Sequence, residues 1–127
     1  MDRVTGLGGF FFKSDNPGEL YAWYEKHLGL KKEPHGGVLF PWKDAQNDTP
    51  GRTVWGIFPK DTQYFNPSRS SFMMNFRVDD LDRLLEVLRQ EGVEIDERRE
   101  EYSYGRFAWI MDPEGNRIEL WEPRGGY

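Results

Sequence analysis

Two amphipathic helices are the clearest elements in the pattern of apolar and polar positions. The first places large side chains at the i, i+3, i+4 and i+7 spacing of one helical face: Leu20, Trp23, Tyr24 and His27. Asn16 precedes this stripe as an N-cap, Pro17 suits the first helical position, and Gly29 can close the helix in a left-handed conformation. The second helix carries four leucines on one face: Leu81, Leu84, Leu85 and Leu88. Asp79 or Asp80 caps it, and Gly92 ends it.

Short strands surround both helices. After the first helix we expect strands at about 37–42 and 53–58, with a short pairing strand nearby. After the second helix we expect strands at about 93–96, 106–111 and 117–121. Residues 43–52 are polar and contain Pro50-Gly51, which indicates a hairpin connection, and residues 112–116 form a tight turn.

The order of elements repeats along the chain. An offset of 64 residues places the first expected strand and helix on the second set, with apolar, capping and glycine positions in the same order. This pattern predicts two βαβββ modules, at about 4–61 and 70–127, joined by a linker at about 60–71. We therefore expect one α+β domain over residues 1–127, whose two curved mixed sheets enclose a cavity.

Composition excludes several classes of protein. The 127 residues include no cysteine, so disulfide scaffolds and thiol catalysis are excluded. The net charge of −5, from 17 basic and 22 acidic residues, argues against a dedicated nucleic-acid binder. The longest apolar run is 107–111, far short of a membrane span of about 20 residues. The first residues lack the pattern of a signal peptide, and we expect a soluble, cytoplasmic protein.

Three blocks resemble the vicinal oxygen chelate superfamily, which includes glyoxalase I, bleomycin-resistance proteins and extradiol dioxygenases. They are residues 23–30 (WYEKHLGL), 75–82 (NFRVDDLD) and 112–121 (DPEGNRIELW), and the last is the most specific. With the repeat, the resemblance covers nearly the whole chain. It implies paired βαβββ modules and a homodimer.

The resemblance also implies a divalent metal ion, held by one ligand from the first and last strand of each module. The repeat locates these four positions at Gly9, Trp55, Met73 and Glu119. Only Glu119 offers a donor that such an ion prefers. We therefore expect no complete metal site and no cofactor. A non-standard divalent site, with His35 as a substitute ligand, is the alternative.

Strand alternation directs a mainly aromatic set of side chains towards the expected cavity. The predicted ligand-binding residues are Phe11, Trp55, Met73, Asn75, Arg77, Phe107, Trp109 and Trp121. Such a lining is typical of a small-molecule site, although these rings could also simply fill the space between the sheets. Glu119 is the candidate general base or polar anchor, and the alternative is an ion pair with Arg77 or Lys13.

Other residues have weaker claims. His27 is expected to pack or cap the first helix, and His35 either reaches the cavity mouth or is a solvated turn residue. Tyr64 and Phe65 either cover the cavity as a flap or anchor the linker in the core. Tyr102 and Tyr104 are candidates for the rim of the cavity. Gly8 and Gly9 are expected to permit a bulge or a close backbone approach.

These observations favour a protein that binds a small organic molecule in an aromatic cavity, as bleomycin-resistance proteins do. The alternative is a lyase- or isomerase-type enzyme that uses Glu119 as its base, with charge stabilisation by Arg77, His35 or a tyrosine. No nucleic-acid or membrane partner is expected.

Overall fold

The computed structural model describes residues 3–43 and 50–127. The first half contains β1 (Gly6–Ser14), α1 (Pro17–Leu28), β2 (Val38–Lys43) and β3 (Pro50–Pro59). The second half contains β4 (Phe72–Arg77), α2 (Leu81–Gln90), β5 (Ile95–Tyr102), β6 (Gly105–Met111) and β7 (Arg117–Pro123). No helix in the described ranges is both long and apolar enough to cross a membrane.

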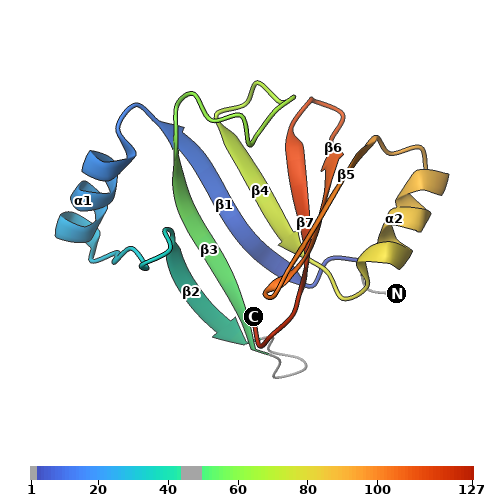
Figure 1. Ribbon diagram of the computed structural model, residues 1–127, viewed down its shortest axis with the longest axis horizontal. Helices are drawn as coiled ribbons and strands as arrows, with labels where there is room; N and C mark the ends of the chain where they lie inside the picture. The colour runs from blue at the N-terminus through green and yellow to red at the C-terminus, as the bar shows by residue number, and fades with distance from the viewer. Residues whose placement is uncertain (1–2, 44–49) are drawn as a thin grey trace.

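The described strands form one mixed sheet in the order β2-β3-β1-β4-β7-β6-β5. Within the halves, β1 runs parallel to β3 and β4 runs parallel to β7. The antiparallel pairing of β1 with β4 joins the halves, so the two expected sheets are continuous at their first strands. The sheet is not closed into a barrel, and α1 and α2 lie at opposite sides of the molecule (Figure 1). The α+β class is confirmed.

The helix boundaries follow the capping residues read from the sequence. The Asn16 side chain accepts a hydrogen bond from the Glu19 backbone N–H at 3.2 Å, and Gly29 closes α1 with a φ of 72°. At α2, Asp80 rather than Asp79 is the N-cap, because its side chain accepts from the Arg83 backbone N–H at 3.1 Å. Both helices therefore start and end for local reasons.

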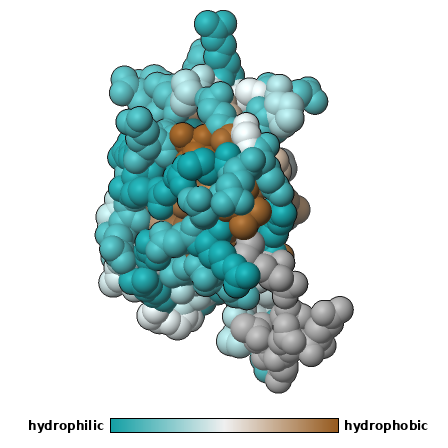
Figure 2. All heavy atoms as spheres, turned by 90° about the vertical axis from the view of Figure 1, so that its right-hand side faces the viewer, coloured by the Kyte–Doolittle hydropathy of each residue, from teal (hydrophilic) through white to brown (hydrophobic). Residues whose placement is uncertain are grey.

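The two helices are buried to very different extents. On α2, Leu81, Leu84 and Leu85 are buried against Ala108 and Leu120 of the sheet. The opposite side of α2 is polar, and Figure 2 shows a largely hydrophilic surface there. In contrast, α1 has no fully buried residue, and its expected core residue Trp23 is 51% exposed. Packing of α1 rests on partly buried aromatic rings instead.

Module one differs from the expected βαβββ pattern within the described residues. Its helix is followed by β2 and β3 only, which pair antiparallel across the predicted hairpin connection. The additional short strand is not found among residues 3–43 and 50–59, and residues 44–49 lie outside the described ranges. Residues 50–52 belong to β3 rather than to a loop, because they continue its pairing with β2.

Candidate functional site

A cavity of about 250 Å³ opens on the face of the sheet that the helices do not cover. Ile118 and Leu120 of β7 pack towards α2, so Glu119 between them faces the cavity. The cavity lining is mainly aromatic with a few polar groups: Gly8, Phe11, Leu39, Arg52, Val54, Tyr64, Asn75, Tyr104, Phe107, Glu119, Trp121 and Tyr127. We call this space the aromatic cavity.

Strand register brings the polar floor of the cavity together. One row of paired Cα positions crosses five strands: Val54, Gly9, Asn75, Glu119 and Trp109. These residues are separated by up to 110 positions in the sequence, yet they lie on neighbouring strands. The parallel pairing of β4 with β7 places the Asn75 amide beside the Glu119 carboxylate.

The Glu119 carboxylate is held by three hydrogen-bond donors and is only 2% exposed. Its Oε2 accepts from the Tyr64 hydroxyl and from Trp109 Nε1 at 3.0 Å, and its Oε1 accepts from Asn75 Nδ2 at 2.6 Å. Burial raises the pKa of Glu119 above its ordinary value of 4.5, and the three hydrogen bonds act in the opposite direction. Among the described residues no cation forms an ion pair with this carboxylate, so the alternative of a salt bridge to Arg77 or Lys13 is wrong.

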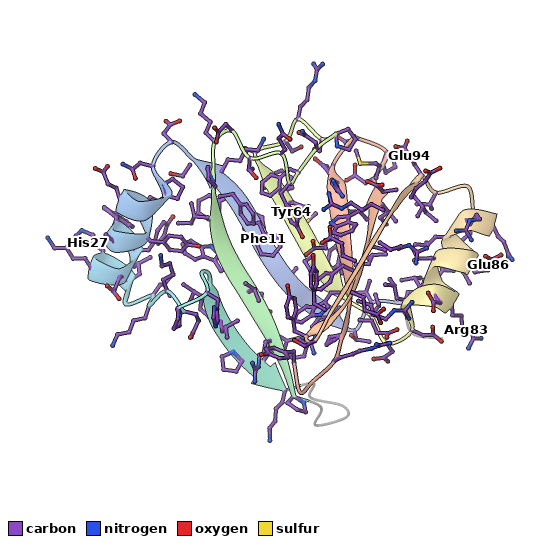
Figure 3. The ribbon with its side chains drawn as sticks, in the orientation of Figure 1. Phe11, His27, Tyr64, Arg83, Glu86 and Glu94 are labelled. Carbon is purple, nitrogen blue, oxygen red and sulfur yellow. The ribbon has the colours of Figure 1, made fainter. Side chains whose placement is uncertain are left out.

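Tyr64 reaches Glu119 from the segment between the two halves of the sheet. Its neighbour Phe65 is completely buried, while the Tyr64 ring stacks on Phe58 with centroids 5.6 Å apart. The segment therefore anchors in the core and also supplies a wall of the cavity, which combines both sequence-based alternatives. Figure 3 shows Tyr64 and Phe11 pointing into the space between the two halves. Burial and the nearby Glu119 raise the pKa of Tyr64, which keeps its hydroxyl a donor.

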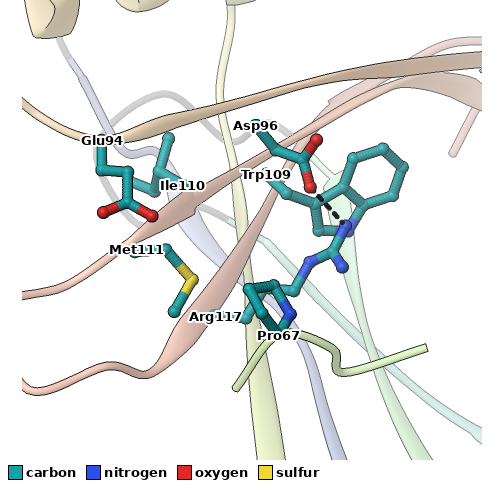
Figure 4. A pocket seen from close by; sticks show the side chains of 7 residues that line it. All are labelled: Pro67, Glu94, Asp96, Trp109, Ile110, Met111 and Arg117. Atoms are coloured by element: carbon teal, nitrogen blue, oxygen red, sulfur yellow. Dashed lines mark ion pairs between the residues drawn. The ribbon is translucent and has the colours of Figure 1, made fainter. Parts of the chain in front are cut away.

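Arg117 fixes this segment from behind Trp109. Its Nη1 donates to the backbone oxygens of Asn66 and, at 3.4 Å, of Tyr64, and its guanidinium lies 4.9 Å from the Trp109 ring centroid. Its Nη2 forms an ion pair with Asp96 at 3.4 Å, beside a second cavity of about 170 Å³ (Figure 4). Arg117 thus positions two of the three donors to Glu119.

Two glycines make room for the floor of the cavity. The pairing of β1 with β4 is irregular between Leu7 and Gly9, which confirms the expected bulge. A Cβ atom at Gly8 would overlap Oδ1 of Asn75, and one at Gly9 would lie 2.7 Å from the Phe11 ring. Close approach of side chains therefore requires glycine here.

Asn75 carries the orphaned polar atom of the floor. Its Nδ2 donates a hydrogen bond to Glu119, while its buried Oδ1 has no hydrogen-bond partner within the described structure. Asn75 is 2% exposed and lines the aromatic cavity. A donor on a bound molecule would satisfy this oxygen.

The predicted ligand-binding residues lie in different places relative to the cavity. Phe11, Asn75, Phe107 and Trp121 line the cavity together with Glu119. Met73 and Trp109 are buried in the adjoining aromatic cluster, and Arg77 lies over the Trp121 ring with its guanidinium carbon 4.8 Å from the ring centroid.

The placement of Trp55 in the cavity is wrong. Its ring lies on the other face of the sheet, with its centroid 4.7 Å from that of Tyr24 on α1. The row that contains Glu119 crosses β3 at Val54, one position before the residue obtained from the offset of 64. A shift of one residue along a strand transfers the side chain to the opposite face.

The remaining sequence candidates lie as follows. Tyr104 lines the cavity and stacks on Tyr102 with centroids 5.2 Å apart, so this pair forms part of the rim. His35 is exposed and does not line the cavity. His27 lies on the outer side of α1 beside Trp23, 4.8 Å between centroids (Figure 3).

Sequence reasoning missed four lining residues: Leu39, Arg52, Val54 and Tyr127. Strand alternation on β3 could have identified Arg52 and Val54 once Trp55 was assigned to the opposite face. No local pattern singles out Leu39 or Tyr127, because both reach the cavity only through tertiary packing.

The residues around Glu119 do not fit a family-type metal ion. Its oxygens face an O–H and two N–H donors, whereas a divalent cation requires further nitrogen or oxygen lone pairs. Gly9 and Met73 offer no such ligand, and the described residues contain no group of three or more His, Asp or Glu side chains arranged for a metal.

Comparison with known proteins identifies the family and the fold. The model of the Glyoxalase/Bleomycin resistance protein/Dioxygenase superfamily matches residues 11–120. No curated protein sequence matches the chain. Methylmalonyl-CoA epimerase from Mycobacterium tuberculosis is similar in structure, with a TM-score of 0.61, 21% identity and coverage of 98% of this chain and 92% of that one.

Two further structures share the fold at lower identity. A Streptomyces coelicolor methylmalonyl-CoA epimerase in complex with 2-nitronate-propionyl-CoA has a TM-score of 0.67 and 13% identity, covering 96% of this chain and 99% of that one. A Legionella pneumophila structure named NAD-dependent benzaldehyde dehydrogenase has a TM-score of 0.56 and 16% identity, covering 91% and 98%. Names this different on one fold show that the fold alone does not assign a reaction.

Proposed function

Since the chain belongs to the Glyoxalase/Bleomycin resistance protein/Dioxygenase superfamily, we propose that it binds a small organic molecule in the aromatic cavity without a family-type metal ion. The observation that carries this proposal is the enclosure of Glu119 by Tyr64, Asn75 and Trp109. These donors supply the polar contacts that a metal ion would otherwise make with the carboxylate. The lining of aromatic rings provides the apolar contact area that retains a small ligand.

The first test is binding of neutral aromatic probes, 2-naphthol and indole, measured by the shift in melting temperature and by isothermal titration calorimetry. We expect saturable binding that Phe107→Ala weakens about tenfold or more, because this ring lines the cavity. Trp23→Ala is the matched control, since it removes an aromatic ring on the outer side of α1. Equal affinity of the Phe107→Ala variant, or failure of every aromatic probe to bind, neutral or anionic, would overturn the proposal.

The metal part of the proposal has its own test. The untagged protein is incubated with Mg, Mn, Fe, Co, Ni and Zn salts, desalted, and analysed for metal by mass spectrometry. We expect a ratio near zero. About one metal ion per chain would contradict the proposal, and the ligands that bind the ion together with Glu119 would then have to be identified.

A second candidate function is general-base catalysis by Glu119 on a molecule in the same cavity. The raised pKa of this carboxylate favours it, because a base of higher pKa accepts a proton more readily. Glu119→Gln separates the two functions. A binding pocket keeps most of its affinity for 2-naphthol in this variant, whereas general-base turnover falls by about 10²–10⁴-fold.

The homodimer remains a prediction. Light scattering after size-exclusion chromatography gives the mass in solution, and a monomer mass at high protein concentration would contradict it.

A further inference from the structure

Two guanidinium groups lie close together at one end of the aromatic cavity, and neither has a carboxylate partner among the described residues: Arg52 lines the cavity, and Arg77 lies behind it over the ring of the lining residue Trp121. The two residues are in direct contact, because Arg77 Nη1 donates to the Arg52 backbone oxygen at 3.4 Å. Neither side chain takes part in an ion pair within residues 3–43 and 50–127. Arg77 is only 7% exposed, so a cation is buried here without an ion-pair partner in the described part of the chain.

Aromatic rings hold these two cations in place. The Arg77 guanidinium carbon lies 5.5 Å from the Trp42 ring centroid and 4.8 Å from that of Trp121, and Arg52 lies 4.9 Å from the Tyr127 centroid. Cation–π contacts of this kind stabilise the guanidinium groups but do not neutralise their charge. Burial and the neighbouring Arg52 lower the pKa of Arg77, and Asp79 acts in the opposite direction. A bound anion at this end would offset both the burial of the Arg77 charge and its repulsion by Arg52.

The arginine end and the Asn75 floor are separate tiers of the same cavity. Arg77 follows Asn75 by two positions on β4, and its partner Trp121 follows Glu119 by two positions on β7. Two residues along a strand correspond to about 7 Å, which is comparable to the span of a small substituted aromatic ring system. The floor offers the unpartnered acceptor Asn75 Oδ1, and the walls between the tiers include Phe107 and Trp121.

We propose that the ligand of the aromatic cavity is an aromatic anion, a flat ring system with a carboxylate or similar anionic group at one end and a hydroxyl or N–H donor at the other. The anionic group binds Arg52 and Arg77, the ring packs against Phe107 and Trp121, and the donor reaches Asn75 Oδ1. This inference rests on the proposed ligand-binding function and adds the chemical class of the ligand. Guanidinium groups suit carboxylates because they donate two parallel hydrogen bonds.

The test uses 6-hydroxy-2-naphthoate and its uncharged analogue 6-hydroxy-2-naphthamide, titrated by calorimetry at low ionic strength. We expect the anion to bind at least tenfold more tightly than the amide. Arg52→Gln should remove most of this preference while the affinity for the amide stays within about twofold. Arg83→Gln, an exposed arginine on α2, is the control with the same change in net charge and should leave the preference intact.

Two further measurements complete the design. Arg77→Lys keeps the charge but not the planar fork, and a partial loss of the preference is expected, with folding checked by circular dichroism. We also expect 6-hydroxy-2-naphthoate to bind more tightly than 2-naphthoate, because only the hydroxylated anion can donate a hydrogen bond to Asn75 Oδ1. Equal affinity for anion and amide, or a preference that survives Arg52→Gln, would overturn the aromatic-anion assignment and leave the proposed binding function standing. Failure of every naphthalene probe to bind would overturn both.

Discussion

Replacing Glu119 with Gln tests the electrostatics of the site most directly. The side chain keeps its shape and loses its ionisable group. Tyr64 and Trp109 can continue to donate to the remaining amide oxygen. The new amide nitrogen faces Asn75, whose unpartnered Oδ1 becomes available when that amide turns over. The variant is therefore expected to fold and to keep all three hydrogen bonds at residue 119, with Asn75 Nδ2 in place of Oδ1 as the unpartnered atom.

The magnitude follows from linkage between protonation and folding. Burial raises the pKa of Glu119 above 4.5 in the folded protein, so between 4.5 and the folded-state pKa the folded state binds up to one proton more than the unfolded state. The free energy of unfolding of the wild type then falls as pH rises, by up to about 1.4 kcal/mol per pH unit, until the folded-state pKa is passed. The Gln variant lacks this dependence.

The assay is urea denaturation of both proteins from pH 4 to pH 9. The difference in unfolding free energy, variant minus wild type, should be constant below pH 4.5, rise through the window above it, and become constant again. Glu114→Gln makes the same substitution at an exposed turn and should give a curve parallel to that of the wild type. Parallel curves for Glu119→Gln as well would refute the reasoning, and a difference that falls with pH would show that the hydrogen bonds outweigh burial.

Three other substitutions test the supports of the site and the core, each by urea denaturation at pH 8. Tyr64→Phe removes a donor to the buried Glu119 carboxylate and should cost about 1.5–3 kcal/mol; a cost under about 0.5 kcal/mol would mean that this bond contributes little. Leu85→Ala creates a cavity under α2 at a residue only 1% exposed and should cost about 2–5 kcal/mol, which an unchanged midpoint would contradict. Gly8→Ala places a Cβ against Oδ1 of Asn75 and should cost about 1–3 kcal/mol, unless the bulge in β1 moves freely.

Local interactions explain which parts of the fold could be read from the sequence. A helix cap involves residues within three or four positions of each other, so Asn16 and Gly29 identified both ends of α1. Alternation within one strand likewise placed Glu119 opposite Ile118 and Leu120. Burial of α1 could not be read in this way, because Trp23 has the spacing of a core residue and is still half exposed.

The sequence by itself determined the two-helix α+β pattern and the orientation of Glu119 away from α2. Tertiary structure alone decided which residues meet that carboxylate. Tyr64 lies in a connecting segment and Asn75 on another strand, yet both donate to Glu119. Trp55 lies on the opposite face of the sheet from the predicted one, because the register differs by one residue. Periodicity reports only the neighbours of a residue along its own helix or strand. Pairing between strands, which fixes the cavity, depends on contacts between residues far apart in the chain.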